Sequence, residues 1–139
     1  NYGLILGWLS VNNEFVYVPI IFYLGAIFWT LGYDTIYGFQ DIKDDEIIGL
    51  KSTSIKFKKN PKKFLFICYS IFFSSLLMMG YLMELNKYFF VFSAFTFIQL
   101  FYLQIKKLNI QNASSCLSAF KSNNLLGLIV FVLIITGKF

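Results

Sequence analysis

Acidic residues gather in one short stretch of the chain. Five of its seven acidic side chains lie between positions 34 and 46: Asp34, Asp41, Asp44, Asp45 and Glu46. If one helix continues through this stretch at 3.6 residues per turn, Asp34, Asp41 and Asp45 share a face. Carboxylates crowded on one face repel each other, and a bound cation relieves that repulsion. Mg²⁺ binds through one or two carboxylates together with phosphate oxygens. The stretch therefore predicts a site for Mg²⁺ and a diphosphate.

Three further residues could take part in this chemistry. Lys51, just beyond Gly49, is placed to meet the charge of a diphosphate. Trp29 and Tyr37 lie within about two helical turns of Asp34, and the faces of aromatic rings can stabilise a carbocation. The alternative is a solvated acidic loop that only keeps the end of a helix in water. Asp34 favours the site, because it directly follows an apolar run, and an ionisable residue at membrane depth is a functional candidate.

The elements that carry these residues are expected to span a membrane. Of the 139 residues, 58% are hydrophobic and only 14% are charged, whereas about 25% charged residues is usual for a soluble domain. Apolar runs at 15–33, 64–82, 88–105 and 122–138 are each close to the length that crosses a bilayer. Asn60 and Pro61 suit the start of the second span, and the short connection at 84–87 makes the second and third spans an antiparallel hairpin.

The expected fold class is thus all-α, a polytopic transmembrane helical bundle. An apolar stretch at 2–9 precedes the first span, and we expect it to be the tail of a further helix. The chain then reads as a single transmembrane domain over 1–139, a helix stub plus four transmembrane helices. Its N-terminal part is expected to be missing from this sequence.

The charge pattern predicts how the bundle sits in the membrane. All 12 basic residues are Lys, and alternation of the spans places the polar segments 34–63 and 106–121 on one side. These segments hold every lysine except Lys87 and Lys138. The positive-inside rule therefore assigns both polar segments to the cytoplasmic or matrix side. The lysines lie between apolar spans rather than on a soluble face, so we expect no nucleic-acid partner. The run from Lys56 to Lys63 is interpreted as a topology anchor and a contact for anionic lipid.

Two residue types exclude or limit other chemistry. The chain has no His, which rules out His-based triads and His-ligated zinc or haem within it. Cys68 lies in an apolar run and Cys116 in an expected loop, and both are interpreted as small packing residues.

The stretch 27–53 reads IFWTLGYDTIYGFQDIKDDEIIGLKST. It resembles the second aspartate-rich region of the UbiA prenyltransferase superfamily. It is most similar to the branch that acts on 4-hydroxybenzoate, whose pattern is close to YDTxYAxxDxxDDxxxGxKST. Gly38 stands where that pattern has Ala. The segment from Phe120 to Asn123, followed by an apolar run, resembles the last helix of the family.

This resemblance implies a bundle of nine transmembrane helices, of which the chain would provide the end of the fifth through the ninth. Two aspartate-rich motifs would face each other across a cavity and hold Mg²⁺ with a polyprenyl diphosphate. The first motif is absent from this sequence, so the fragment alone is expected to be inactive. The resemblance and the residue chemistry together assign the metal to Asp41, Asp45 and Asp44, and catalysis to Asp41, Asp45, Lys51 and Tyr37. They assign substrate binding to Asp34, Lys51, Tyr37 and, through its aromatic ring alone, Trp29.

The implied reaction is Mg²⁺-dependent transfer of a polyprenyl group to the ring of 4-hydroxybenzoate, in ubiquinone biosynthesis. The allylic diphosphate ionises, the cation alkylates the ring ortho to the hydroxyl, and loss of the ring proton restores aromaticity. The expected location is a bacterial inner membrane or the mitochondrial inner membrane. One alternative is a prenyltransferase of the same superfamily with another acceptor, of the menaquinone, chlorophyll or haem type. Another is a non-enzymatic cation transporter, although the spans 64–82 and 88–105 hold no charged residue of the kind that transport usually requires.

Overall fold

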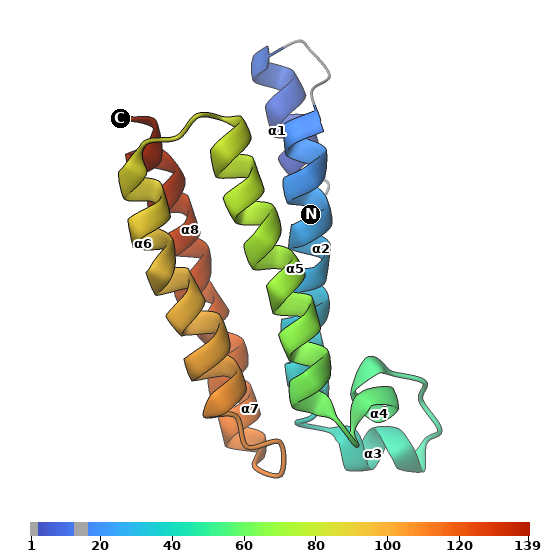
Figure 1. Cartoon of the computed structure of the whole chain (residues 1–139). Coiled ribbons are helices and arrows are strands. Elements are labelled where there is room, and N and C mark those ends of the chain that lie inside the picture. Colours follow the sequence, from blue (N-terminus) through green and yellow to red (C-terminus); the bar gives the residue numbers. More distant parts are fainter. Residues whose placement is uncertain (1–2, 13–16) are drawn as a thin grey trace.

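The computed structural model describes residues 3–12 and 17–139, and every regular element in this described part is a helix. The elements in chain order are α1 (Gly3–Asn12), α2 (Tyr17–Gly38), α3 (Ile42–Ile47), α4 (Thr53–Phe57), α5 (Pro61–Leu82), α6 (Lys87–Phe97), the π-helical segment η1 (Ile98–Lys106), α7 (Ala113–Lys121) and α8 (Asn123–Lys138). Long helices run side by side, and the short helices α3 and α4 lie at one end of the bundle (Figure 1). The predicted all-α class is therefore confirmed.

Four helical stretches are long and apolar enough to cross a membrane: Tyr17–Gly38, Pro61–Leu82, Lys87–Lys106 and Ala113–Lys138. Each overlaps one of the four predicted spans, and α1 confirms the predicted helix at the start of the chain. Positions 15 and 16 of the first predicted span, and position 2 of the predicted stub, lie outside the described residues. The second span begins as predicted, with Asn60 at the N-cap and Pro61 in the first turn of α5.

The last predicted span begins too late. The segment 106–121 was expected to be a loop, but its second half forms α7, which continues the direction of α8. The Asn112 side chain caps α7 by accepting hydrogen bonds from the backbone N–H groups of Ser114 and Ser115. Cys116, expected in a loop, is consequently a buried residue of α7.

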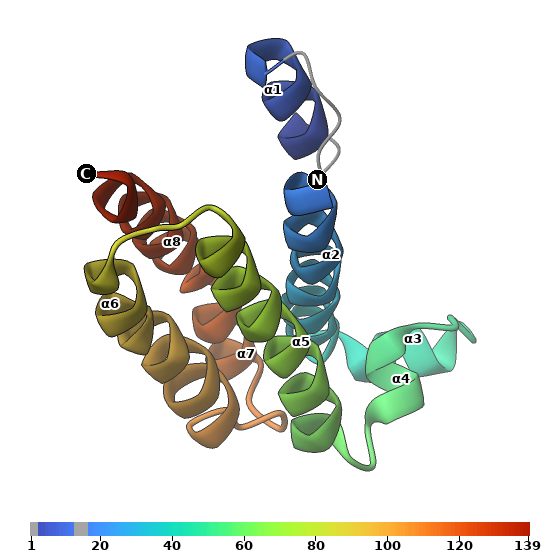
Figure 2. The same ribbon diagram turned by 45° about the horizontal axis from the view of Figure 1, so that its top comes forward.

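Helix α2 packs along α5 at close range, whereas α6 packs against α8, and α7 contacts α2 (Figure 2). Two glycines of α2 allow the close contact between α2 and α5. A Cβ atom on Gly25 would overlap the side chain of Ser75, and one on Gly32 would lie 2.5 Å from the Tyr69 ring. Small residues at such points let transmembrane helices pack backbone to backbone.

The hairpin between α5 and α6 closes the opposite end of the bundle. Glu84 adopts a left-handed conformation with φ of 52°, and the Asn86 side chain caps α6 by accepting from Tyr88 and Phe89. The backbone N–H of Asn86 also donates to the carbonyl of Gly137, 2.9 Å away, which ties the start of α6 to the end of α8. The predicted antiparallel hairpin is thus confirmed.

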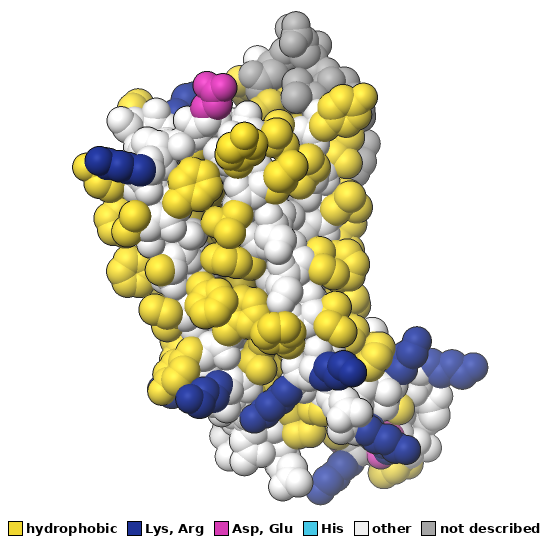
Figure 3. Space-filling model, viewed as in Figure 1, with side chains coloured by type: hydrophobic (Ala, Val, Ile, Leu, Met, Phe, Trp, Pro, Cys, Tyr) yellow, Lys and Arg dark blue, Asp and Glu magenta, His cyan; other side chains and the backbone are white. Residues whose placement is uncertain are grey.

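Large apolar side chains cover the outside of the long helices. Figure 3 shows hydrophobic side chains along the length of the bundle and Lys side chains gathered at its lower end. Phe66, Phe95 and Phe131 are each more than half exposed. Such a surface suits lipid rather than water, because a large exposed apolar area on a soluble protein would drive association.

A polar network crosses the interior of the bundle. The Trp29 indole N–H of α2 donates to the Asn123 side-chain oxygen of α8 over 2.9 Å. The Gln104 amide of η1 donates to the same oxygen over 2.9 Å, and the Tyr69 hydroxyl of α5 donates to Gln104. Four elements are therefore joined by hydrogen bonds that the lipid around them could not provide.

Candidate functional site

The acidic stretch is divided between two helices. Helix α2 ends at Gly38, a turn follows, and α3 begins after Asp41, its N-cap residue. The chain leaves the helix because Phe39, only 3% exposed, turns into the hydrophobic core. The prediction of one continuous helix with Asp34, Asp41 and Asp45 on a single face is therefore wrong. Asp34 stays exposed in the last turns of α2.

The turn between α2 and α3 borders a pocket of about 670 Å³. Residues 39–44 form one side of it. The other side is formed by Ile110 and Gln111 of the connection before α7 and by Ala113, the first residue of α7. The two polar segments predicted to share one side of the membrane therefore meet at the same end of the bundle. Of the residues that line it, Asp41 and Asp44 were predicted as site residues, whereas the polar residues Gln40, Lys43 and Gln111 were not.

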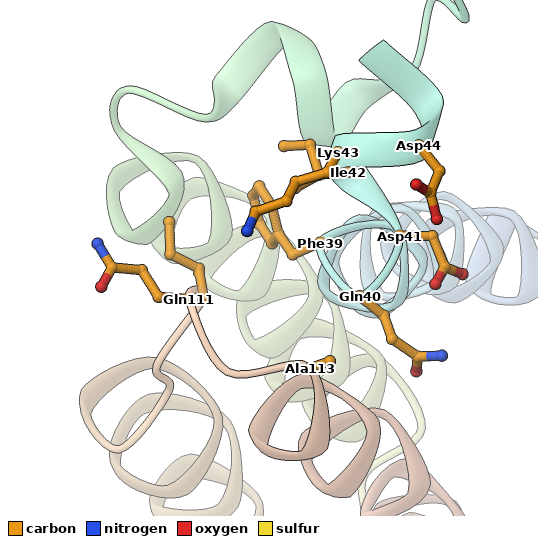
Figure 4. Close-up of a pocket in the computed structure, with 9 residues that line it drawn as sticks. Phe39, Gln40, Asp41, Ile42, Lys43, Asp44, Gln111 and Ala113 are labelled. Atoms are coloured by element: carbon orange, nitrogen blue, oxygen red, sulfur yellow. The ribbon is translucent and has the colours of Figure 1, made fainter. Parts of the chain in front are cut away.

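Oxygen atoms gather on one side of this pocket. Figure 4 shows the carboxylates of Asp41 and Asp44 and the amide of Gln40 pointing to the same side, while Lys43 reaches toward Gln111. Although Asp41 is the N-cap residue of α3, its carboxylate accepts no capping hydrogen bond and stays available. The Gln40 side-chain oxygen is buried and has no hydrogen-bond partner within the described part of the chain. A buried acceptor of this kind is costly unless a cation or donor meets it.

The segment after α3 folds back onto the end of α2 and fixes the turn. The Thr53 and Thr35 hydroxyls lie 2.7 Å apart and share a hydrogen bond. Ser52 caps α4 by accepting from the backbone N–H of Ile55. Ser54 is buried directly against Gly38, where a Cβ atom would overlap its hydroxyl. The motif residues Ser52 and Thr53, together with Ser54 just after the motif, therefore hold the segment after α3 against the end of α2.

Gly49 allows the chain to reverse between α3 and α4. Its φ of +73° lies in the left-handed region, which glycine adopts without steric cost. Lys51 follows this reversal and is exposed, and it lies outside the residues that line the pocket. Lys43, rather than Lys51, is the lysine that lines the pocket.

Aromatic side chains of α2 form a wall beside the acidic turn. The rings of Tyr33 and Tyr37 pack against Phe120 of α7, with centroid distances of 5.8 and 4.8 Å. Tyr37 remains partly open, with 44% of its surface exposed. Trp29 lies deeper, stacked on Phe72 at 5.2 Å. The sequence singled out Trp29 and Tyr37 but not their partners on α7 and α8, which only the fold brings near.

The oxygen atoms of Asp41, Asp44 and Gln40 are of the type that binds a hard divalent cation, but they are too few to fill its coordination shell. Among the described residues, no group of three or more Asp, Glu, Cys or His side chains is close enough to hold a metal ion. Asp45 lies next to Asp44 in α3 but does not line the pocket. Two carboxylates and an amide oxygen are nevertheless ligands that Mg²⁺ accepts when water and phosphate oxygens complete its shell.

Comparison with known proteins agrees with the aspartate-rich pattern. The model of the UbiA prenyltransferase family matches residues 2–133. The chain is 36% identical to the mitochondrial 4-hydroxybenzoate polyprenyltransferase of Bos taurus, over 99% of this chain and 37% of the relative. It is 31% identical to the 4-hydroxybenzoate octaprenyltransferase of Francisella tularensis subsp. novicida (strain U112), over 96% of this chain and 46% of the relative. The chain thus spans less than half the length of these curated relatives. No solved structure matches it.

Proposed function

The chain belongs to the UbiA prenyltransferase family, and we propose that it forms one half of the active site of a polyprenyltransferase whose acceptor is 4-hydroxybenzoate. Both relatives compared above carry names for that reaction, and each is considerably longer than this chain. The other half of the site would come from the part of the relatives that the chain does not cover. We propose ubiquinone biosynthesis as the pathway and a bacterial or mitochondrial inner membrane as the location.

The observation that supports this proposal most is the oxygen-lined side of the pocket. Asp41, Asp44 and the unpaired oxygen of Gln40 point to one side, at the membrane end where the lysines gather. A polyprenyl diphosphate has a charged head and an apolar tail. Its head therefore suits this end of the bundle, and its tail suits the apolar length.

Bound Mg²⁺ would supply electrostatic neutralisation of the diphosphate as it leaves. In this proposal Asp41, Asp44 and Asp45 hold the cation, with Asp34 in support, and Gln40 adds a neutral oxygen. Lys43 in the first turn of α3 and Lys51 beyond its end attract the diphosphate. The exposed part of Tyr37 faces the prenyl carbon that becomes cationic, because an aromatic ring can stabilise a nearby cation.

The test is prenyl transfer in membranes that carry the full-length protein. Labelled 4-hydroxybenzoate, a polyprenyl diphosphate and Mg²⁺ are supplied, and a parallel sample contains a chelator. We expect the label to move into lipid only where Mg²⁺ is available, and this chain alone to transfer none. Chelator-resistant transfer would contradict the metal proposal. Transfer to other aromatic acceptors but not to 4-hydroxybenzoate would place the protein in another branch of the family.

Single substitutions test the residues. Asp41→Asn and Asp44→Asn should each lower the rate of transfer about a hundredfold or more, the usual cost of losing one electrostatic contact to the transition state. Glu84→Gln is the matched control, because Glu84 lies in the hairpin at the opposite end of the bundle. Membrane insertion should be the same for all three. Near-normal rates in both Asp variants, with the control unchanged, would refute the assignment of the pocket.

A further inference from the structure

A second pocket, outside the acidic site, lies where α5 begins and η1 ends. Its volume is about 420 Å³, and one of its sides is formed by Lys59, Lys62 and Lys63. The other side is the connection 108–111 that follows η1. The Lys62 ammonium donates to the carbonyl of Lys106, the last residue of η1, over 3.5 Å, so the start of α5 contacts the end of η1 beside the pocket.

The positive charge of this pocket is not balanced by the protein. Within the described residues the one ion pair of this end joins Lys58 to Glu46, away from the pocket lining. Lys59, Lys62 and Lys63 are exposed and form no ion pair there. The ammonium groups of Lys106 and Lys107 lie over the Tyr102 ring, each 5.2 Å from its centroid. A pocket with this much uncompensated positive charge attracts an anion.

An apolar surface continues from the pocket toward the middle of the bundle. Lys62, Phe66 and Phe73 lie on one face of α5, because their spacings of four and seven residues return to the same side of a helix. Phe66 contacts Phe101 of η1 with centroids 5.4 Å apart, and Phe73 contacts Phe97 at 5.5 Å. The rings extend about 16 Å along the helix from Lys62. Phe66 and Phe97 are 55% and 48% exposed.

We propose that this pocket and the phenylalanines beside it bind one anionic phospholipid. The phosphate of the headgroup lies among Lys59, Lys62 and Lys63, and an acyl chain follows Phe66, Phe73 and their partners on η1. The lysines lie at the start of α5, where its apolar span begins, and the phenylalanines lie further along that span. The pocket therefore matches the charged headgroup of a phospholipid, and the rings match its apolar chain. The lipid would fasten α5 to η1 from the outside, independently of the acidic pocket.

The measurement is native mass spectrometry of the full-length protein in neutral detergent with added phosphatidylglycerol. Phosphatidylcholine and soluble glycerol 3-phosphate are the two comparison ligands. We expect phosphatidylglycerol to bind at least tenfold more tightly than either of them. Equal binding of phosphatidylcholine would overturn the role of the lysines, and equal binding of glycerol 3-phosphate would overturn the role of the apolar surface.

The triple variant Lys59→Gln, Lys62→Gln and Lys63→Gln should weaken phosphatidylglycerol binding by about a hundredfold at low salt, because each Lys near an anionic lipid contributes roughly a factor of five. Phosphatidylcholine binding should not change. If circular dichroism shows that the triple variant does not fold, Lys62→Gln alone should still weaken binding about fivefold.

The matched control removes the same charge elsewhere, through Lys56→Gln, Lys87→Gln and Lys138→Gln. These lysines lie outside the pocket, and two of them are at the other end of the bundle. The control should bind phosphatidylglycerol within threefold of the unmodified chain. An equal loss in the control would show a response to net charge only and would overturn the site.

Discussion

The strongest test of the fold is the removal of one amide from its interior. Asn123 is 8% exposed, and its side-chain oxygen accepts hydrogen bonds from Trp29 and Gln104, both over 2.9 Å. In Asn123→Ala the indole N–H of Trp29 loses this partner, and the Gln104 amide keeps only a 3.3 Å contact with Ser122. An unsatisfied buried donor costs about 1–3 kcal/mol in water-soluble proteins, and hydrogen bonds between membrane helices average about 0.6 kcal/mol. The variant also loses two local bonds from the Asn123 amide to the carbonyls of Ala119 and Phe120. For the two lost bonds to Trp29 and Gln104 we expect a destabilisation of about 2 kcal/mol.

The assay is unfolding in mixed micelles by increasing the mole fraction of SDS, followed by circular dichroism. Asn124→Ala is the matched control, because Asn124 is the next residue of α8, is exposed and carries the same change in helix propensity. In a Trp29→Phe background, Asn123→Ala should cost about 0.6 kcal/mol less than in the unmodified chain, since one of its bonds is already absent. If Asn123→Ala and Asn124→Ala unfold at the same SDS fraction, the hydrogen-bond network contributes nothing and the reasoning is refuted.

Two further substitutions test packing and surface charge. Gly25→Ala should destabilise the α2–α5 contact by about 1–3 kcal/mol relative to Gly127→Ala in the same assay, because the added carbon would overlap Ser75, whereas Gly127 has room for it. Equal stability of the two variants would show that the helices do not approach closely at Gly25. Glu46→Gln removes the exposed ion pair with Lys58 and should change stability by less than about 1 kcal/mol, measured at low salt. A larger loss would mean that this pair holds α3 against α4.

Hydropathy and turn chemistry predicted most of the fold. The apolar runs were long enough to define four spans, and the signals at Asn60 and Pro61 located the start of α5 within a residue. The start of α7 was missed because Ser114, Ser115 and their neighbours are too polar to extend an apolar run. Their helix depends on the cap from Asn112 and on packing against α2, which hydropathy does not report.

The candidate site was predicted in composition but not in geometry. Helical periodicity placed Asp34, Asp41 and Asp45 on one face, because nothing local marks the end of α2 except Gly38. The break depends on Phe39, whose burial is a property of the assembled core. The same break brings Gln40 into the pocket, a residue with no charge to draw attention in the sequence. The sequence pattern therefore predicted a cation site with carboxylate ligands. Tertiary packing determines which side-chain oxygens lie at the same pocket.

The π-helical segment shows how polar groups in lipid can determine backbone winding. Gln99 and Gln104 are five residues apart, so an α-helix would point them about 140° away from each other. In a π-helix, whose hydrogen bonds join residues five apart, they lie on nearly the same side. Gln99 donates to the Ser122 carbonyl, and Gln104 donates to Asn123, so both reach the start of α8. Because an unpaired amide in the bilayer costs several kcal/mol, the unusual winding is favoured by the partners it provides. Asn123 in turn holds Trp29 on the face of α2 that continues to Tyr37, and the aromatic wall of the acidic pocket is thereby anchored in the polar interior of the bundle.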